Sequence, residues 1–293
     1  MNNLLVLVLY LLFFTLGSAS PRDIPAFVSA EWLSQNLERP NLFILDIRNK
    51  DSYQQGHIPG SLHAPFSSWV AQRDNLLLEL PPEKALREHL GSLGLSRDAL
   101  VVIVNKTDTD WNRADATRVA WTCILAGVQN ASVLDGGINR WLRLGLPTSA
   151  ETVPARIRNF DSPLDTSSLI QKEELMGSTD RFTIIDGRIP EEYFGIPPGY
   201  GHIPGAHNLP VPWLFNSDGT IREASELKAM ASSVVGSIKD EPVVVYCQVG
   251  GFASALWFIL TEKLEYRNVR IFDGSYQEWS QDPDAPVASF CWE

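Results

Sequence analysis

A long internal repeat is the feature of this sequence that most constrains its fold. An apolar stretch ending in Asp-x-Arg occurs twice, at Phe43–Arg48 and at Thr183–Arg188. Each copy is followed by the same five residues, Gly-His-Ile-Pro-Gly, at Gly56–Gly60 and Gly201–Gly205, which lie 145 residues apart. Solenoid units span only about 20 to 50 residues, so this period predicts two copies of a whole domain.

Further segments repeat in the same order. They are Val101–Asn105 with Val243–Cys247, and Leu134–Trp141 with Phe272–Trp279. The short Val- and Ile-rich runs alternate with helical stretches such as Ala114–Ala126 and Ala253–Leu264. This alternation predicts an α/β fold in which each domain has a mostly parallel sheet flanked by helices on both faces.

The chain length agrees with this division. With 293 residues the chain exceeds one ordinary hydrophobic core and favours two domains. Pro147, Pro154 and Pro163 fall in a stretch with little apolar periodicity, which is typical of a connector. We therefore expect domains at residues 24–146 and 168–292, joined by a linker over residues 147–167.

The first residues have the pattern of a targeting signal. Leu4–Leu16 is an apolar run of thirteen residues, followed by small residues that suit cleavage near Ala19 or Ser20. We predict a signal peptide over residues 1–19 and hence an exported protein, periplasmic or secreted. Because Met1–Asn3 carries no Lys or Arg, an uncleaved membrane anchor remains open.

The charge and the cysteines exclude several classes of partner. The formal net charge is −11 and no basic run occurs, so nucleic acid is not an expected partner. The three cysteines, Cys123, Cys247 and Cys291, have no spacing typical of a disulfide framework or a metal site. We expect Cys123 to be packed core, and any cysteine chemistry to use a single thiol.

Cys247 is the candidate nucleophile. It follows the buried-type strand Val243–Tyr246, and Gly250 and Gly251 lead from it into a helix. Ligands of open parallel sheets bind at this edge, where backbone N–H groups at a helix start hold anions. Such a ring of N–H groups is expected to lower the thiol pKa and to hold an anionic sulfur attached to the thiolate.

Together, these motifs resemble those of rhodanese domains, and the tandem arrangement resembles the thiosulfate and 3-mercaptopyruvate sulfurtransferases over roughly residues 25 to 290. The resemblance implies an enzyme, a sulfurtransferase, that moves sulfane sulfur through a persulfide on the catalytic Cys247. It implies a small anionic sulfur donor, a thiol or cyanide acceptor, and no cofactor or metal; we also expect a monomer. Expected substrate-binding residues are Arg188, by motif position, and the loop Gln248, Val249, Gly250, Gly251, Phe252 and Ala253. For Arg188 a structural ion pair is an open alternative.

The first copy has no nucleophile at the matching place. Its strand ends at Asn105, and the loop Lys106–Asn112 has no glycine pair. We therefore expect the first domain to be non-catalytic and to form one wall of the active-site cleft. We expect His57 and His202 to hold loops in place, without a general-base role.

The cysteine loop departs from both known subtypes of the family. Gln248 and Val249 are neutral, whereas thiosulfate-using members typically carry cations there and mercaptopyruvate enzymes small hydroxyl residues. We therefore predict a donor other than free thiosulfate, or a high KM for it. Ala253, six positions after the cysteine, stands where related phosphatases have arginine, which argues against that activity. The alternatives are a non-enzymatic persulfide carrier, a redox-sensing or partner-binding module, and a duplicated fold without activity.

Overall fold

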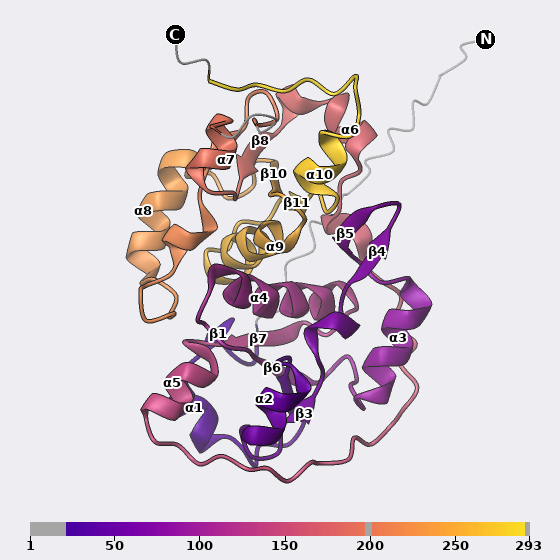
Figure 1. Cartoon of the computed structure of the whole chain (residues 1–293), viewed down its shortest axis with the longest axis vertical. Helices are drawn as coiled ribbons and strands as arrows, with labels where there is room; N and C mark the ends of the chain where they lie inside the picture. Colours follow the sequence, from indigo (N-terminus) through magenta and orange to yellow (C-terminus); the bar gives the residue numbers. More distant parts are fainter. Residues whose placement is uncertain (1–21, 197–200, 291–293) are drawn as a thin grey trace, which may run out of the picture.

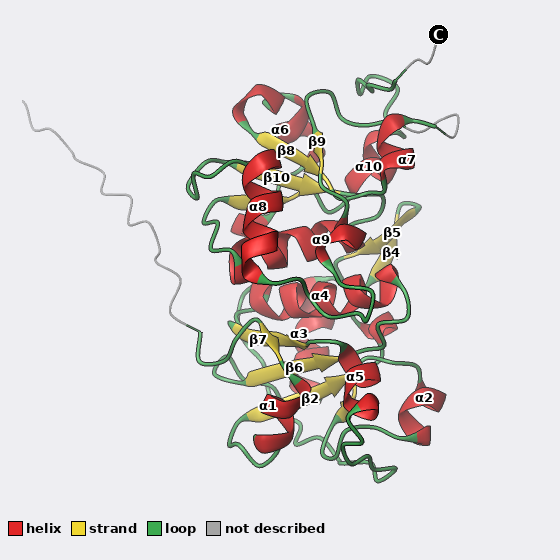
Figure 2. Ribbon diagram, turned by 90° about the vertical axis from the view of Figure 1, so that its left-hand side faces the viewer, coloured by secondary structure: helices red, strands yellow, loops and turns green. Residues whose placement is uncertain are grey.

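The structure is a computed structural model that describes residues 22–196 and 201–290. Two open sheets lie at opposite ends of the molecule, with helices α4 and α9 between them (Figure 2). The signal peptide predicted for residues 1–19 and Cys291 lie outside the described residues. Within the described ranges, no helix combines the length and the apolar character needed to cross a bilayer.

The first sheet is entirely parallel, with strand order β1-β7-β6-β2-β3. Its strands are β1 (Phe27–Val28), β2 (Leu42–Asp46), β3 (Leu62–His63), β6 (Leu100–Val104) and β7 (Asn130–Leu134). The helices of this half are α1 (Ala30–Gln35), α2 (Lys50–Gln55), the short η1 (Phe66–Ser68), α3 (Glu83–Ser92), α4 (Asp110–Leu125) and α5 (Gly137–Arg143). The predicted parallel sheet is confirmed here.

The second sheet is also parallel, with strand order β11-β10-β8-β9. Its strands are β8 (Thr183–Asp186), β9 (His207–Asn208), β10 (Val243–Tyr246) and β11 (Val269–Ile271). Its α-helices are α6 (Lys172–Met176), α7 (Pro190–Phe194), α8 (Ala224–Val234), α9 (Gly251–Phe258) and α10 (Ser275–Trp279). Short helical turns are η2 (Thr166–Ser168), η3 (Thr179–Arg181), η4 (Val211–Leu214) and η5 (Ile259–Lys263).

Side chains alternate across each central strand, so each sheet is covered on both faces. In β6, Val102 belongs to an outer core with α1 and α5, whereas Ile103 belongs to the central core. In β10, Val244 belongs to an outer core and Val245 to the central core. The central core runs through α4 and α9 from one sheet to the other, so the two halves share a continuous hydrophobic core.

An antiparallel hairpin interrupts the first half and was not predicted from the sequence. Its strands are β4 (Ala71–Arg73) and β5 (Leu76–Glu79), joined by Asp74 and Asn75, which both have positive φ. Two such residues form the tight turn that matches strand twist, so this pair was an available hairpin signal. Figure 1 shows the hairpin extending toward the second half. There the Leu77 N–H donates to Gln277 Oε1 at 2.9 Å, and Gln277 Nε2 donates to the Leu77 carbonyl at 2.9 Å.

The two central helices begin earlier than predicted, and local capping explains both starts. Helix α4 begins at Asp110 because Thr109 Oγ1 accepts a hydrogen bond from the Asn112 N–H at 3.1 Å. Helix α9 begins at Gly251, directly after Gly250, which has a left-handed φ of 85°. The α9 N-terminus therefore faces the residues that follow β10.

Candidate active site

Backbone N–H groups surround the sulfur of Cys247, which directly follows β10. The side chain is fully buried, and the backbone N–H groups of Val249, Gly250 and Ala253 favour the ionised form of the thiol, which lowers its pKa. A Cβ on Gly250 would lie 2.8 Å from both the carbonyl oxygen and the Oδ1 atom of Asp273. Glycine is therefore required there for both its φ and its size. Of the loop predicted for Gln248–Ala253, these three amides contact the sulfur.

The expectation of a lowered thiol pKa at Cys247 is wrong. Burial raises the pKa of this thiol above its ordinary value, and the three N–H groups and a nearby carboxylate, Asp186, act on it in opposite directions. The N–H groups lower the pKa, but complete removal from water outweighs them. Burial therefore disfavours the thiolate of Cys247, although backbone donors that favour an anion lie beside the sulfur.

Ser275, which sequence reasoning missed, also contacts Cys247. Its Oγ accepts from the Cys247 N–H at 3.1 Å, lies 4.0 Å from Sγ, and donates to the Phe272 carbonyl at 3.0 Å. Its φ of 54° is left-handed, a conformation that costs a non-glycine residue about 1–3 kcal/mol. The repeat contained a signal, because the matching residue of the first copy is Gly137, also left-handed with φ 55°.

Arg188 is buried and almost fully occupied by scaffold groups. Its Nε and Nη2 donate to the Asp186 carboxylate at 3.0 and 2.6 Å, and Nη2 donates to the Gly201 carbonyl at 2.5 Å. The guanidinium also lies 4.1 Å from the centre of the Tyr276 ring. Its Nη1 donates to Gln248 Oε1 at 3.3 Å, which directs one edge of the guanidinium to the cysteine loop.

The first half contains the same ion pair without a cysteine beside it. Arg48 Nε and Nη2 donate to Asp46 at 2.9 and 2.6 Å, and Nη2 donates to the Gly56 carbonyl at 2.8 Å. Since the arrangement also occurs in the half that has no cysteine at the matching position, it serves the scaffold. The substrate-binding role predicted for Arg188 therefore depends on Nη1 alone.

The two repeated histidines hold loops, as expected. His57 stacks on Tyr53 with ring centres 3.8 Å apart, and His202 stacks on Tyr193 at 4.0 Å. The Nδ1 atom of each histidine hydrogen-bonds the carbonyl of the tyrosine on which it stacks, at 2.8 Å. Cys123 is completely buried and, as expected, belongs to the central core.

A cavity of about 410 Å3 borders the cysteine loop and takes residues from both halves; we call it the interdomain cavity. Its lining residues are Asp108, Thr109, Asp110, Trp111, Arg113, Arg188, Ile189, Glu192, Gln248 and Phe252. Trp111 stacks on Phe252 with ring centres 4.6 Å apart. The first half thus forms one wall of the cleft, as predicted. Gln248 and Phe252 are the residues of the cysteine loop that line the cavity, whereas Cys247 does not line it.

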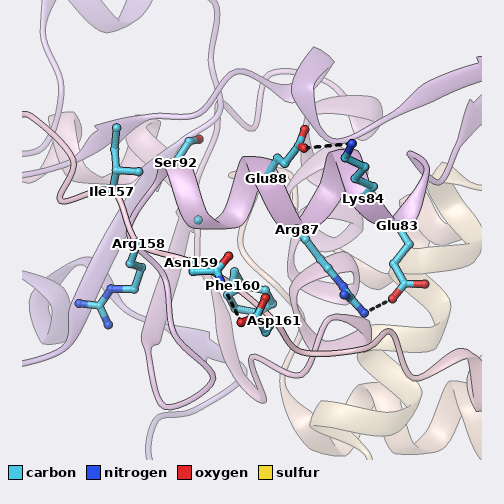
Figure 3. Close-up of a pocket in the computed structure, with 11 residues that line it drawn as sticks. Glu83, Lys84, Arg87, Glu88, Ser92, Ile157, Arg158, Asn159, Phe160 and Asp161 are labelled. Carbon is cyan, nitrogen blue, oxygen red and sulfur yellow. Dashed lines mark hydrogen bonds and ion pairs between the residues drawn. The ribbon is translucent and has the colours of Figure 1, made fainter.

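A larger cavity, of about 670 Å3, lies between α3 and the connector (Figure 3). Four of its charged side chains form local pairs, Arg87 with Glu83 and Lys84 with Glu88. No residue of the cysteine loop lines this cavity, whereas Gln248 and Phe252 of that loop line the interdomain cavity. We therefore assign the chemistry to the smaller interdomain cavity.

An ion pair between the two halves supports the cysteine loop from behind. Arg118 of α4 binds the Asp273 carboxylate, with Nη2 at 3.1 Å from Oδ2, and also donates to the Leu78 carbonyl. The Leu80 N–H donates to Asp273 Oδ2 at 3.3 Å. Because Asp273 lies against Gly250, α4 and the β4–β5 hairpin both restrain the loop.

The described part of the chain holds no group of three or more His, Cys, Asp or Glu residues placed to bind a metal ion.

Comparison with known protein families identifies the family to which this chain belongs. A model of the rhodanese-like domain matches residues 29–144 and 168–282. The chain belongs to the rhodanese family. It is a tandem rhodanese-like sulfurtransferase, and the suspected family is confirmed.

Relatives align over nearly the whole chain. "Sulfur carrier protein TtuD" of Thermus thermophilus is 28% identical over 93% of this chain and 99% of its own length. A protein named "Putative thiosulfate sulfurtransferase" in Haloferax volcanii is 29% identical over 89% of this chain and 95% of its own.

Solved structures share the fold of this tandem rhodanese. The anaerobic ergothioneine biosynthesis enzyme of Chlorobium limicola, in complex with trimethyl histidine, matches with a TM-score of 0.77 at 24% identity, over 90% of this chain and 70% of that one. YnjE matches with a TM-score of 0.78 at 24% identity, over 90% and 68% of the two chains. At this identity the likeness establishes the fold alone.

Proposed function

We propose that this protein moves sulfane sulfur from a small donor to a thiophilic acceptor through a persulfide on Cys247. The observation that carries the proposal is the convergence of the Val249, Gly250 and Ala253 N–H groups on Sγ. Donors fixed in a site without water stabilise negative charge strongly because they need no reorganisation when the charge forms. A persulfide anion on Cys247 would place such a charge beside these donors.

The proposed relay has two balanced steps. The Cys247 thiol first loses its proton to solvent, and the resulting thiolate attacks the outer sulfur of the donor. The bond between that sulfur and the rest of the donor breaks, and the leaving group keeps the electron pair. With thiosulfate the leaving group is sulfite. An acceptor nucleophile, cyanide or a thiolate, then attacks the outer sulfur of the persulfide. The S–S bond breaks, and its electron pair returns to Sγ.

The surroundings of the sulfur disfavour thiosulfate as the physiological donor. Gln248 and Val249 are neutral, and the guanidinium of Arg188 is already bound to Asp186. A dianion therefore gains little charge-assisted hydrogen bonding at this site, where such a bond contributes about 1.5–3 kcal/mol. We expect a millimolar or higher KM for thiosulfate in a cyanide-coupled assay; saturation at low micromolar thiosulfate would contradict this expectation.

Intact mass spectrometry tests the persulfide directly. Incubation with a sulfane donor is expected to add one sulfur, about 32 Da, to the wild-type chain. Cys247→Ser is expected to lose both the adduct and turnover. Cys123→Ser is the matched control because that cysteine is also buried but lies within α4, outside the cysteine loop. An adduct that persists in Cys247→Ser would refute the assignment of the nucleophile.

A second candidate function is a persulfide carrier that delivers sulfur to another protein. Two observations favour it: one relative is named a sulfur carrier protein, and Sγ is fully buried beside the interdomain cavity. Single-turnover discharge of the persulfide distinguishes the two functions. Rapid discharge by cyanide or small thiols supports the enzyme, whereas a persulfide stable to both supports the carrier.

We also propose that the protein is exported, on the sequence pattern of residues 1–19. N-terminal sequencing of the protein purified from its native cells tests this. A mature chain that begins near Pro21 would support cleavage, and an intact Met1 in a membrane fraction would support the anchor.

A further inference from the structure

Negatively charged groups outnumber positively charged groups in the lining of the interdomain cavity. Three carboxylates line it, those of Asp108, Asp110 and Glu192, against the two guanidinium groups of Arg113 and Arg188. Most cavities that bind small anions present a cation that is not paired with another group of the protein. Its charge-assisted hydrogen bonds offset the free energy of removing the anion from water. The availability of the two arginines therefore decides which ligand charge this cavity accepts.

Both arginines already form ion pairs and hydrogen bonds with other groups of the protein. Arg113 binds Asp110, donates to the Thr107 carbonyl at 2.6 Å, and lies 5.5 Å from the centre of the Phe215 ring. Arg188 forms its buried pair with Asp186, a carboxylate behind the cavity wall. Each guanidinium is thus neutralised by its own partner, and neither supplies a free positive charge.

Two carboxylates remain without a cationic partner. Asp108 Oδ1 accepts from a neutral amide, Asn139 Nδ2, at 2.6 Å. The half-buried carboxylate of Glu192 forms no hydrogen bond or ion pair with any residue in the ranges 22–196 and 201–290; Arg188 acts on it only through its charge and Asp186 opposes that effect. The cavity beside Cys247 therefore carries an excess negative charge.

An aromatic surface lies next to these carboxylates. Trp111 stacks on Phe252 of the cysteine loop, yet 44% of the tryptophan remains exposed. An open indole face attracts cations through its negative π surface. The acidic and aromatic groups thus favour the same kind of ligand charge.

We infer that the interdomain cavity selects a sulfur acceptor with a positive charge near its thiol, an aminothiol, over neutral and anionic thiols. This inference rests on the proposed persulfide relay at Cys247. The acceptor's ammonium group would lie among Asp108, Glu192 and the face of Trp111. Its thiolate attacks the outer persulfide sulfur, the Sγ–S bond breaks with its electron pair left on Sγ, and the acceptor leaves as its own persulfide.

Cysteamine and N-acetylcysteamine are the probes for this inference, because they share a skeleton and differ in the ammonium charge. The measurement is kcat/KM for each thiol as acceptor, in wild type and in the double variant Asp108→Asn, Glu192→Gln. Asparagine keeps the oxygen that accepts from Asn139, and glutamine keeps the length of the side chain. Comparing the ratio of the two thiols between proteins cancels their different intrinsic reactivities.

We expect the double variant to lower the cysteamine to N-acetylcysteamine ratio about tenfold, the size expected for two partly exposed charge pairs. N-acetylcysteamine alone should change less than about twofold, and added salt should reduce the wild-type preference. Glu38→Gln is the matched control, because Glu38 is exposed and precedes β2, whereas the first-half residues of the cavity follow the parallel strand β6, at the other end of that sheet's strands. Its ratio should equal that of wild type.

The outcomes separate this inference from the proposed function. If both thiols discharge the wild-type persulfide and the double variant leaves their ratio unchanged, the inference is overturned and the relay stands. If the wild-type chain forms no persulfide with any donor, the proposed function itself fails. 3-Mercaptopropionate, an anionic thiol, gives a further test. If wild type prefers it over N-acetylcysteamine by a larger factor than the double variant does, the inference is also overturned.

Discussion

The loops after β6 and β10 occupy equivalent positions in the two halves but carry different side chains. In both loops, the carbonyl of the first residue accepts a hydrogen bond from the helix that follows the next strand. The Asn105 carbonyl accepts from the Ile138 N–H of α5, and the Cys247 carbonyl accepts from the Tyr276 N–H of α10, each at 2.9 Å. In the first loop, however, Asn105 Nδ2 donates to the Asn112 carbonyl at 2.8 Å. A side-chain amide thus occupies the place where the second loop presents a thiol to three N–H groups.

The comparison separates scaffold from chemistry. Features present in both halves, such as the Asp-Arg pair and the histidine stacked on tyrosine, hold the fold together whether or not a nucleophile is present. Features present in one half are candidates for function: Cys247, the left-handed Gly250, and Ser275 in place of Gly137. The first half therefore serves as an internal control for assigning structural or functional roles to residues of the second half.

The largest expected effect comes from exchanging the residues at the two strand ends. Cys247→Asn should lower turnover at least about 10³-fold, because the nucleophile is lost. Adding Asn105→Cys to that variant should restore no activity, since the first loop lacks a left-handed glycine and the donors that follow it. Thiocyanate formation measures both. Recovery of activity in the exchanged chain would show that the glycine loop is dispensable.

The repeated ion pair gives the next largest effect, on stability. Arg48→Met or Arg188→Met leaves a buried carboxylate without its partner, which costs about 3–5 kcal/mol. We expect the free energy of unfolding in urea to fall by similar amounts for the two variants. A much smaller loss at Arg188 would mean that its pair is not scaffold. To detect a role in donor binding, Arg188→Lys should be compared with Arg48→Lys for the donor KM.

Substitution of the left-handed first residue of α5 and of α10 should have unequal effects in the two halves. Gly137→Ser introduces a Cβ that clashes with the Asn105 carbonyl, so we expect destabilisation of about 2–3 kcal/mol. Ser275→Gly relieves strain but loses the hydrogen bond from the Cys247 N–H, so its net effect should stay within about 1 kcal/mol.

Ser275→Ala is the control for that pair because alanine keeps the strained φ and also loses the hydrogen bond. It should be less stable than Ser275→Gly by about 1 kcal/mol in thermal or urea unfolding. Equal stability of the two variants would indicate that the left-handed φ of Ser275 carries no strain.

The smallest expected effect is on the pH dependence of Cys247 alkylation. An exposed cysteine has a pKa of about 8.5, and burial raises the pKa of Cys247 above its ordinary value. A smaller fraction of the folded protein is therefore thiolate at pH 7, and the iodoacetamide rate should rise through pH 9 without levelling off. In urea the inflection should return to about 8.5. A plateau below pH 7.5 in the folded protein would contradict this.

Local patterns along the chain predicted much of the fold and part of the site. The apolar runs, the repeated Gly-His-Ile-Pro-Gly segments and the Asp-x-Arg ends identified two α/β domains. A thiol between a buried strand and two glycines identified Cys247, because strand end, turn and helix start are all local features. The Asp74-Asn75 turn and the Ser275 substitution were local signals too, and sequence reasoning missed both.

The amino-acid sequence by itself determined the duplicated architecture, the position of the candidate nucleophile and the absence of a matching cysteine from the first half, since each depends on short motifs that are read locally and then compared between the two copies. The tertiary structure alone decided the raised thiol pKa, the engagement of Arg188 by Asp186 and Gly201, and the excess negative charge of the interdomain cavity. These properties arise from burial and from charges brought together across the fold. Desolvation and Coulomb energies depend on distances through space, which spacing along a sequence does not specify.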